Sequence, residues 1–124
     1  MIADKKTLLI VDDAAFIRKK LREIIEPLEF VEIVGEAKNG QEAIDMYKDL
    51  KPDLVTMDLI MPIMGGIEAI EKIRAHDQLS KIIVISQVGD EDKVLEASEK
   101  GALDYIHKPF DKKRVVKVLE NLLT

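Results

Sequence analysis

The sequence predicts an α/β protein built on a doubly wound, five-stranded parallel sheet. Five short apolar runs alternate along the chain with stretches whose apolar residues recur at the spacing of one helix face. Strict alternation of this kind is typical of a parallel sheet that helices cover on both faces. The five runs are Leu8–Val11, Val31–Glu36, Leu54–Met57, Ile82–Ile85 and Leu103–His107.

The composition of the runs indicates their places in the sheet. Strands that are buried on both faces of a sheet are almost wholly apolar, whereas edge strands also carry polar residues. Leu8–Val11, Leu54–Met57 and Ile82–Ile85 are almost wholly apolar, whereas Val31–Glu36 and Leu103–His107 carry charged residues. The order 2-1-3-4-5, known from flavodoxin-like sheets, places those two charged runs at the edges.

Each helical stretch is limited by a local signal. A proline removes a backbone donor, a glycine accepts the left-handed conformation after a helix, and an aspartate can cap the first turn. The signals are Pro27 at the end of the first helix, a turn at Asn39-Gly40 and a break at Lys51–Asp53 around the second, Gly65-Gly66 before the third, Gly101 after the fourth and Asp111 before the fifth. The expected buried stripes are Ile17, Leu21, Ile24, Ile25 and Leu28; Ala43, Ile44, Tyr47 and Leu50; Ile67, Ile70 and Ile73; Val94, Leu95 and Ser98; and Val115, Val116, Leu119, Leu122 and Leu123.

The bulk composition predicts one globular domain over residues 1–124. The chain is 47% hydrophobic, carries a net charge of −5 and contains no cysteine. The length suffices to bury a core without disulfides, and the acidic balance disfavours broad binding to nucleic acids. No apolar run reaches the length of about 20 residues that a membrane span needs. We therefore expect a cytoplasmic monomer that neither binds nucleic acid directly nor inserts into a membrane.

Polar side chains follow four of the five apolar runs, where each run ends. They are Asp12 and Asp13, Asp58, Ser86, and Lys108 with Pro109. The carboxyl ends of parallel strands meet at one edge of a sheet, and ligands bind beyond that edge, so we expect these side chains to converge. Three carboxylates suit Mg²⁺, which prefers oxygen ligands. A hydroxyl and an ammonium can meet the charge of a phosphoryl group.

Three segments carry a resemblance to a known family. They are Leu9–Arg18 (LIVDDAAFIR), Pro52–Asp58 (PDLVTMD) and Met61–Gly66 (MPIMGG). With Ser86 and Lys108-Pro109 in the same order, essentially the whole chain resembles the response-regulator receiver domain of two-component signalling. It is closest to the single-domain, CheY-like chemotaxis members. The resemblance implies a flavodoxin/CheY-like (βα)5 fold and a phosphorylation-dependent switch that is not a turnover enzyme.

The resemblance also implies a role for each polar residue at the sheet edge. Asp58 would be the phosphoacceptor. Asp12 and Asp13 would hold Mg²⁺ together with Asp58 and the backbone carbonyl of Ile60. Lys108 would contact the phosphoryl oxygen and would form a cis peptide bond with the proline that follows it.

Two further residues would report the phosphorylation outward. Ser86 would donate a hydrogen bond to the phosphoryl group, and Tyr105 would then turn inward, unless it is simply an edge-strand tyrosine packed on a helix. The surface that changes would consist of Asp92–Lys100, Leu103–His107 and Lys112–Leu119. A histidine kinase would be the phosphodonor, a protein such as a flagellar motor switch component would be the output partner, and a phosphatase could reset the switch.

Three positions depart from the pattern of the family. Gln87 stands after Ser86, where family members commonly carry a small residue, so access to the phosphoryl group is in question. Ile60 and Val88 lie two residues past Asp58 and Ser86, where variable side chains influence how water reaches the acyl phosphate. Because both are apolar and branched, we predict slow self-dephosphorylation.

Three alternatives stay open on the sequence. The chain could be a phosphorelay intermediate, or an unphosphorylated pseudo-receiver that acts as an adaptor, which Gln87 leaves possible. It could also be a small aspartyl-phosphate phosphohydrolase. Such enzymes need a general acid two residues after the nucleophile, where this chain has Ile60.

His76 and His107 are interpreted as surface residues without a ligand role.

Overall fold

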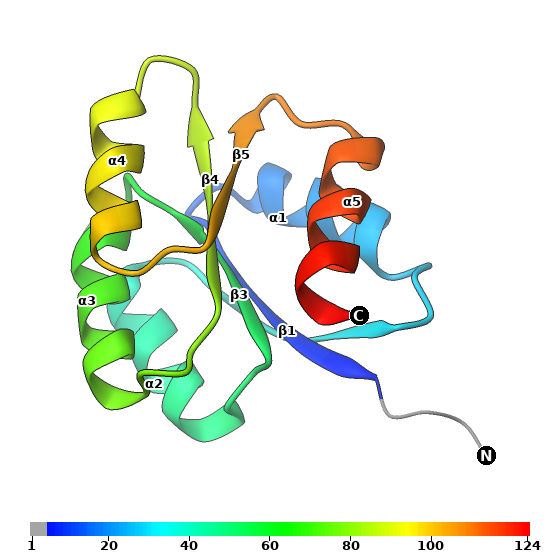
Figure 1. Cartoon of the computed structure of the whole chain (residues 1–124), viewed down its shortest axis with the longest axis horizontal. Coiled ribbons are helices and arrows are strands. Elements are labelled where there is room, and N and C mark those ends of the chain that lie inside the picture. Colours follow the sequence, from blue (N-terminus) through cyan, green and yellow to red (C-terminus); the bar gives the residue numbers. More distant parts are fainter. Residues whose placement is uncertain (1–4) are drawn as a thin grey trace.

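A computed structural model describes residues 5–124, and it confirms the predicted α/β fold (Figure 1). Five strands form one parallel sheet in the order β2-β1-β3-β4-β5. The elements are β1 Lys6–Val11, α1 Ala15–Ile25, β2 Val31–Ala37, α2 Gly40–Leu50, β3 Leu54–Asp58, α3 Gly66–His76, β4 Ile82–Gln87, α4 Glu91–Glu99, β5 Asp104–Lys108 and α5 Lys112–Leu123. The two runs with charged residues, β2 and β5, are the edge strands, as the sequence indicated.

The helices cover the two faces of the sheet in two groups, which Figure 1 shows on opposite sides. Alternate residues of the central strands feed the two hydrophobic clusters, because successive side chains of a strand point to opposite faces. Leu9, Val55 and Val84 pack with α2, α3 and α4, whereas Leu8 and Ile83 pack with α1 and α5. The residues at the carboxyl end of each strand continue the same alternation between the two faces of the sheet.

Most of the signals at helix ends are confirmed. The side chain of Asp111 caps α5 by accepting the N–H of Arg114 at 2.9 Å. Gly101 follows α4 with a φ of 118°. The turn expected at Asn39-Gly40 is wrong in part. Asn39 caps α2 through the N–H of Glu42, and Gly40 is already helical.

Several residues of the predicted stripes are not buried. Leu50 is 39% exposed and Leu95 is 63% exposed, and Ser98 is exposed as well. In α5 the buried face includes Val118, which the sequence analysis left out, whereas Val116 is half-buried. An apolar run on a short helix fits two neighbouring faces almost equally well, so the sheet beneath it selects the buried face.

The loop after β3 holds one residue in a costly backbone conformation. Ile63 has a φ of 70° and its side chain is 85% exposed. A β-branched residue in the left-handed region is strained, and asparagine tolerates that region better. Ile63→Asn is therefore expected to raise the free energy of unfolding by about 1 kcal/mol.

Urea denaturation measures this effect. The matched control is Leu79→Asn, because Leu79 is 88% exposed and its φ is not positive. A gain in the control as large as that of Ile63→Asn would mean that loss of exposed apolar surface, and not backbone strain, is responsible.

Within residues 5–124, the helices are all too short or too polar to cross a membrane.

Candidate functional site

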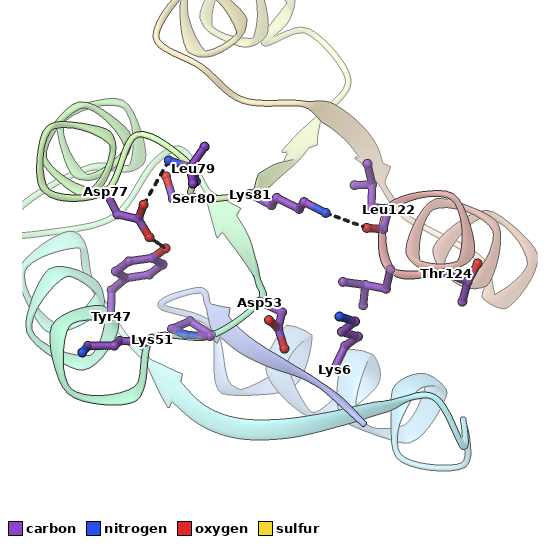
Figure 2. Close-up of a pocket in the computed structure, with 12 residues that line it drawn as sticks. Lys6, Tyr47, Lys51, Asp53, Asp77, Leu79, Ser80, Lys81, Leu122 and Thr124 are labelled. Atoms are coloured by element: carbon purple, nitrogen blue, oxygen red, sulfur yellow. Dashed lines mark hydrogen bonds between the residues drawn. The ribbon is translucent and has the colours of Figure 1, made fainter. Parts of the chain in front are cut away.

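Each end of the sheet carries a cavity. The one at the amino-terminal ends of the strands has a volume of about 520 Å³ and is shown in Figure 2. Its polar groups bond to one another. Tyr47 donates its hydroxyl to Asp77 at 2.8 Å, and Lys81 Nζ donates to the carbonyl of Leu122 at 3.2 Å. Burial and the Asp77 carboxylate raise the pKa of Tyr47, so its phenol stays protonated. These contacts join the segment between α3 and β4 to α2 and to α5.

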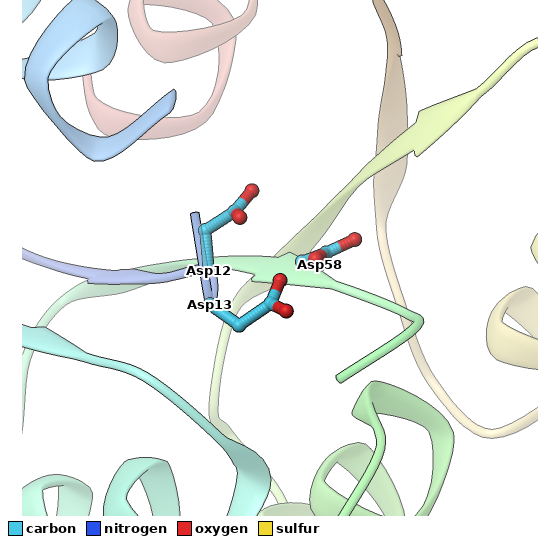
Figure 3. A group of neighbouring side chains, drawn as sticks. All are labelled: Asp12, Asp13 and Asp58. Carbon is cyan, nitrogen blue, oxygen red and sulfur yellow. The ribbon is translucent and has the colours of Figure 1, made fainter. Parts of the chain in front are cut away.

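The opposite end of the sheet gathers three carboxylates. Asp12 and Asp13 follow β1, and Asp58 is the last residue of β3. One oxygen of each lies within 4.8 Å of the others, and Figure 3 shows the three side chains converging. Because β1 and β3 pair directly in the sheet, their carboxyl ends place these residues side by side. The convergence that the sequence predicted is therefore observed.

A cation completes the cluster from the edge strand. Lys108, the last residue of β5, lies 2.9 Å from Asp12 Oδ2 and 3.4 Å from Asp58 Oδ1. Asp12 is 1% exposed and Asp58 is 7% exposed, so the ion pairs are shielded from bulk water. Burial by itself would lower the pKa of Lys108, but the carboxylates of Asp12 and Asp58 outweigh it and raise that pKa. Lys108 is thus a fixed ammonium ion beside the phosphoacceptor candidate.

The electrostatics of Asp58 differ from those of an ordinary carboxyl. Burial and the negative charge of Asp12 raise its pKa from 3.8 to about 6, although Lys108 acts in the opposite direction. Burial and like charge both disfavour an ionised carboxylate, and an opposite charge favours it. The site therefore holds more negative charge than its single ammonium ion can offset.

The donor set fits a hard divalent cation. Three carboxylate oxygens within 4.8 Å, on a pocket open to solvent, match the preference of Mg²⁺ for oxygen ligands and retained water. The raised pKa of Asp58 points the same way, because a cation would relieve the repulsion among the carboxylates. The pocket has a volume of about 360 Å³ and is lined by Asp12, Asp13, Ala14, Ile17, Asp58, Ile60, Gln87, Asp90 and Lys108.

Of the other residues that the sequence predicted for the site, two line this pocket and three do not. Ile60 and Gln87 line the pocket together with Asp58. Ser86 is 1% exposed and does not line it. Tyr105 is 41% exposed and borders a separate cavity against α4. Val88 is 71% exposed and also lies outside the pocket lining.

His107 differs from the sequence interpretation. It was expected to be a surface residue, but it is half-buried on β5, and its Nδ1 atom is buried. Its ring meets the ring of Tyr105 edge to face, with the ring centres 4.9 Å apart. The alternation within β5 could have placed it beside Tyr105, on the face opposite Ile106. His76 is exposed, as expected.

Arg18 positions Asp12, a role that the sequence patterns above did not indicate. Arg18 donates from its guanidinium to the Asp12 carbonyl at 2.7 Å and to the Glu36 carboxylate at 2.9 Å. The Asp12 carboxylate also accepts the N–H of Ala14 at 2.9 Å. A charged residue near the end of an edge strand, together with an arginine in the helix that precedes that strand, was the available signal. Arg18 thereby holds the turn that presents Asp12 to the pocket.

The chain is similar to known proteins in sequence and in fold. The family described as the response regulator receiver domain matches residues 8–120. The chemotaxis protein CheY of Thermotoga maritima is 51% identical over 94% of this chain and 97% of its own length. The CheY of Listeria monocytogenes is 47% identical over 91% of this chain and 94% of its own length. The solved CheX–CheY–BeF3–Mg²⁺ complex of Borrelia burgdorferi matches with a TM-score of 0.88 and 35% identity, over 96% of this chain and 90% of that one.

Proposed function

Since the chain belongs to the response regulator receiver domain family, we propose that it is a chemotaxis switch whose phosphoacceptor is Asp58. The observation that carries the assignment is the convergence of Asp12, Asp13 and Asp58 with Lys108 at 2.9 and 3.4 Å. The protein is a phosphorylation-dependent two-component signalling component. The whole range of residues 1–124 is assigned to this one receiver domain.

The proposed reaction is an in-line displacement at phosphorus. A carboxylate oxygen of Asp58 attacks the phosphoryl group of a phosphohistidine on the kinase. A P–O bond forms while the P–N bond breaks, and the imidazole of the kinase retains the electron pair. Lys108 meets the charge on the transferred oxygens. With a pKa of about 6, Asp58 is mainly an ionised nucleophile at neutral pH.

Asp12, Asp13, Asp58 and the carbonyl of Ile60 would hold the Mg²⁺ ion. When bound there, Mg²⁺ would offset the charge of the approaching phosphodonor. Asp12 is positioned for this task by Ala14 and Arg18. The product on Asp58 is an acyl phosphate, whose lability suits a reversible switch.

The output proposal concerns Ser86 and Tyr105. A phosphoryl group on Asp58 offers Ser86 a charged acceptor, which forms stronger hydrogen bonds than a neutral one. Tyr105 is 41% exposed and would turn inward once Ser86 moves. The surface made by α4, β5 and α5 would then bind its partner differently.

The partners follow from this assignment. A histidine kinase is the phosphodonor, and an output protein reads the phosphorylated surface. A flagellar motor switch component is our proposal for that output protein. A CheX-type phosphatase is our proposal for the reset step, since the Borrelia burgdorferi relative was solved with CheX. The cytoplasmic location and the monomeric state expected from the sequence belong to the same proposal.

Phosphorylation can be measured directly. Incubation with Mg²⁺ and acetyl phosphate is expected to add the mass of one phosphoryl group to the intact protein, and Asp58→Asn is expected to abolish the addition. Asp49→Asn, on the exposed side of α2, is the matched control and should leave it unchanged. An unmodified wild type would support the adaptor alternative, and continuous hydrolysis of unrelated phosphate esters would support the phosphohydrolase.

The lifetime of the phosphoryl group is expected to depend on Ile60 and Val88. Their side chains are 57% and 71% exposed. Ile60 lines the pocket and Val88 follows the lining residue Gln87, so polar replacements at both positions would position water for attack on the acyl phosphate. Ile60→Asn combined with Val88→Glu should accelerate loss of the phosphoryl group about tenfold, or about 1.4 kcal/mol in the barrier. The decay is followed by intact mass after removal of the donor.

The control for the lifetime measurement is Leu79→Glu at the opposite end of the sheet, which should decay at the wild-type rate. A double variant that also decays at that rate would show that these two side chains do not control the lifetime.

A further inference from the structure

Two buried polar atoms lie unpaired beside the site. Ser86 Oγ and His107 Nδ1 have no hydrogen-bond partner within residues 5–124. Buried polar atoms without partners are uncommon, because each retains the cost of losing its water. Ser86 is 1% exposed, so water does not readily take the place of a partner.

The two residues are neighbours across the sheet. Ser86 of β4 is paired directly with His107 of β5. Val84 belongs to the cluster beneath α2, α3 and α4, so by alternation Ser86 points to that face. Ile106 belongs to the cluster on the other face, so His107 points to the same side as Ser86. Adjacent strands lie about 4.8 Å apart, which a hydroxyl and an imidazole can bridge by rotation of their side chains.

The two atoms also match chemically. The Ser86 hydroxyl is a donor, and a neutral imidazole with its proton on Nε2 offers Nδ1 as an acceptor. Glu91 lines the same 320 Å³ cavity as His107 and Tyr105. The pKa of Glu91 is lowered, chiefly by backbone N–H groups of Glu91 and Gly89 and to a smaller extent by the charge of His107. Glu91 is thus a carboxylate that lines the same cavity as the imidazole.

We propose that His107 is a positioning residue whose Nδ1 accepts the Ser86 hydroxyl in the unphosphorylated protein and so competes with the phosphoryl group on Asp58. This inference rests on the proposed function, because it assigns Ser86 as the donor to that group. One hydroxyl proton serves one acceptor at a time. Phosphorylation draws Ser86 to the charged acceptor and leaves the His107 ring unpaired.

The same competition reaches Tyr105. The rings of Tyr105 and His107 are in contact at an interplanar angle of 68°. His107 is therefore a neighbour of Ser86 across the sheet and of Tyr105 through its ring. Release of the imidazole lets it rotate, and the contact that keeps Tyr105 outward is lost. His107 thereby links the hydroxyl that senses the phosphoryl group to the aromatic ring at the surface.

The first test uses NMR of the imidazole nitrogens in ¹⁵N-histidine-labelled full-length protein. In spectra recorded at a pH of about 8, the His107 Nδ1 signal is expected to be that of a hydrogen-bonded acceptor. Ser86→Ala should move it to the position of a free acceptor. The chain contains two histidines, so exposed His76 is an internal control that should not move. A Nδ1 signal that is identical in wild type and Ser86→Ala would overturn the proposal.

The second test measures competition with a phosphoryl mimic. The concentration of beryllofluoride that half-saturates the Mg²⁺-loaded protein is expected to fall about tenfold in His107→Leu, because the competing hydrogen bond is gone. His107→Asn places an amide oxygen near the position of Nδ1 and should restore the wild-type value. Ser86→Ala with His107→Leu should behave as Ser86→Ala alone. Equal values for His107→Leu and His107→Asn would overturn the competition.

The two proposals can fail separately. Failure of the wild type to take up a phosphoryl group on Asp58 would reject the proposed function, and the effect of Ser86→Ala on the His107 signal would still decide whether the hydrogen bond exists. Phosphorylation of Asp58 with an unmoved His107 signal would reject the role of His107 alone.

Discussion

Asp58→Asn is expected to raise the free energy of unfolding of the metal-free protein by about 2 kcal/mol at neutral pH. The reason is the electrostatic cost of ionised Asp58. Its pKa is raised from 3.8 to about 6, chiefly by burial and by the charge of Asp12. A shift of that size corresponds to about 3 kcal/mol, and allowance for solvent at the mouth of the pocket reduces the expected effect to about 2 kcal/mol.

The direction of the pH dependence follows from the raised pKa. Between pH 3.8 and about 6 the folded protein keeps the proton on Asp58 while the unfolded chain has lost it. Stability therefore falls as the pH rises through this window and stays lower above it. The contribution of Asp58 to this fall should be absent in the asparagine variant.

Chemical denaturation at several pH values, with and without Mg²⁺, measures both effects. Millimolar Mg²⁺ is expected to stabilise the wild type, because a ligand that binds only the folded state shifts the unfolding equilibrium. Asp49→Asn is again the control, since Asp49 is exposed on α2. Equal stabilities of wild type and Asp58→Asn without metal at neutral pH would show that the cluster carries no net repulsion.

Gly66→Ala is expected to destabilise the fold by about 3 kcal/mol or more, and to slow phosphorylation of Asp58. A Cβ atom at Gly66 would lie 2.1 Å from the backbone oxygen of Asp58 and 2.9 Å from the Cα of Leu59. Both atoms are backbone, so no side chain can rotate away, and overpacking of this kind costs up to several kcal/mol. The displaced segment is the one that carries Asp58, the proposed phosphoacceptor.

The control for this variant is Gly89→Ala. Gly89 has a φ of 107° but nothing within 4 Å of its added Cβ, so it tests conformational strain without a clash. Its expected cost is about 1 kcal/mol. Denaturation midpoints and the rate of mass gain with acetyl phosphate compare the two. A Gly66→Ala variant no less stable than Gly89→Ala would contradict the close approach of α3 to β3.

The fold and the acidic cluster could be predicted because they depend on local patterns. Burial on both faces gives β1, β3 and β4 unbroken apolar runs, and the direction of the chain brings their polar end residues to one edge. Asp12, Asp13, Asp58 and Lys108 were therefore expected together, and the structure brings them together. The buried face of α5 was less certain, since Val116 and Val118 are both apolar and only the underlying sheet distinguishes them.

The sequence by itself determined the succession of strands and helices along the chain and which polar residues stand at the strand ends. Both follow from the spacing of the apolar residues and from the direction of the chain. Only the tertiary structure decided that burial raises the pKa of Asp58, that Arg18 holds Asp12, and that Ser86 lies beside His107. Each of these depends on register and packing between segments distant along the chain. Such contacts leave no periodic signal in the sequence, since they arise only when the strands are aligned.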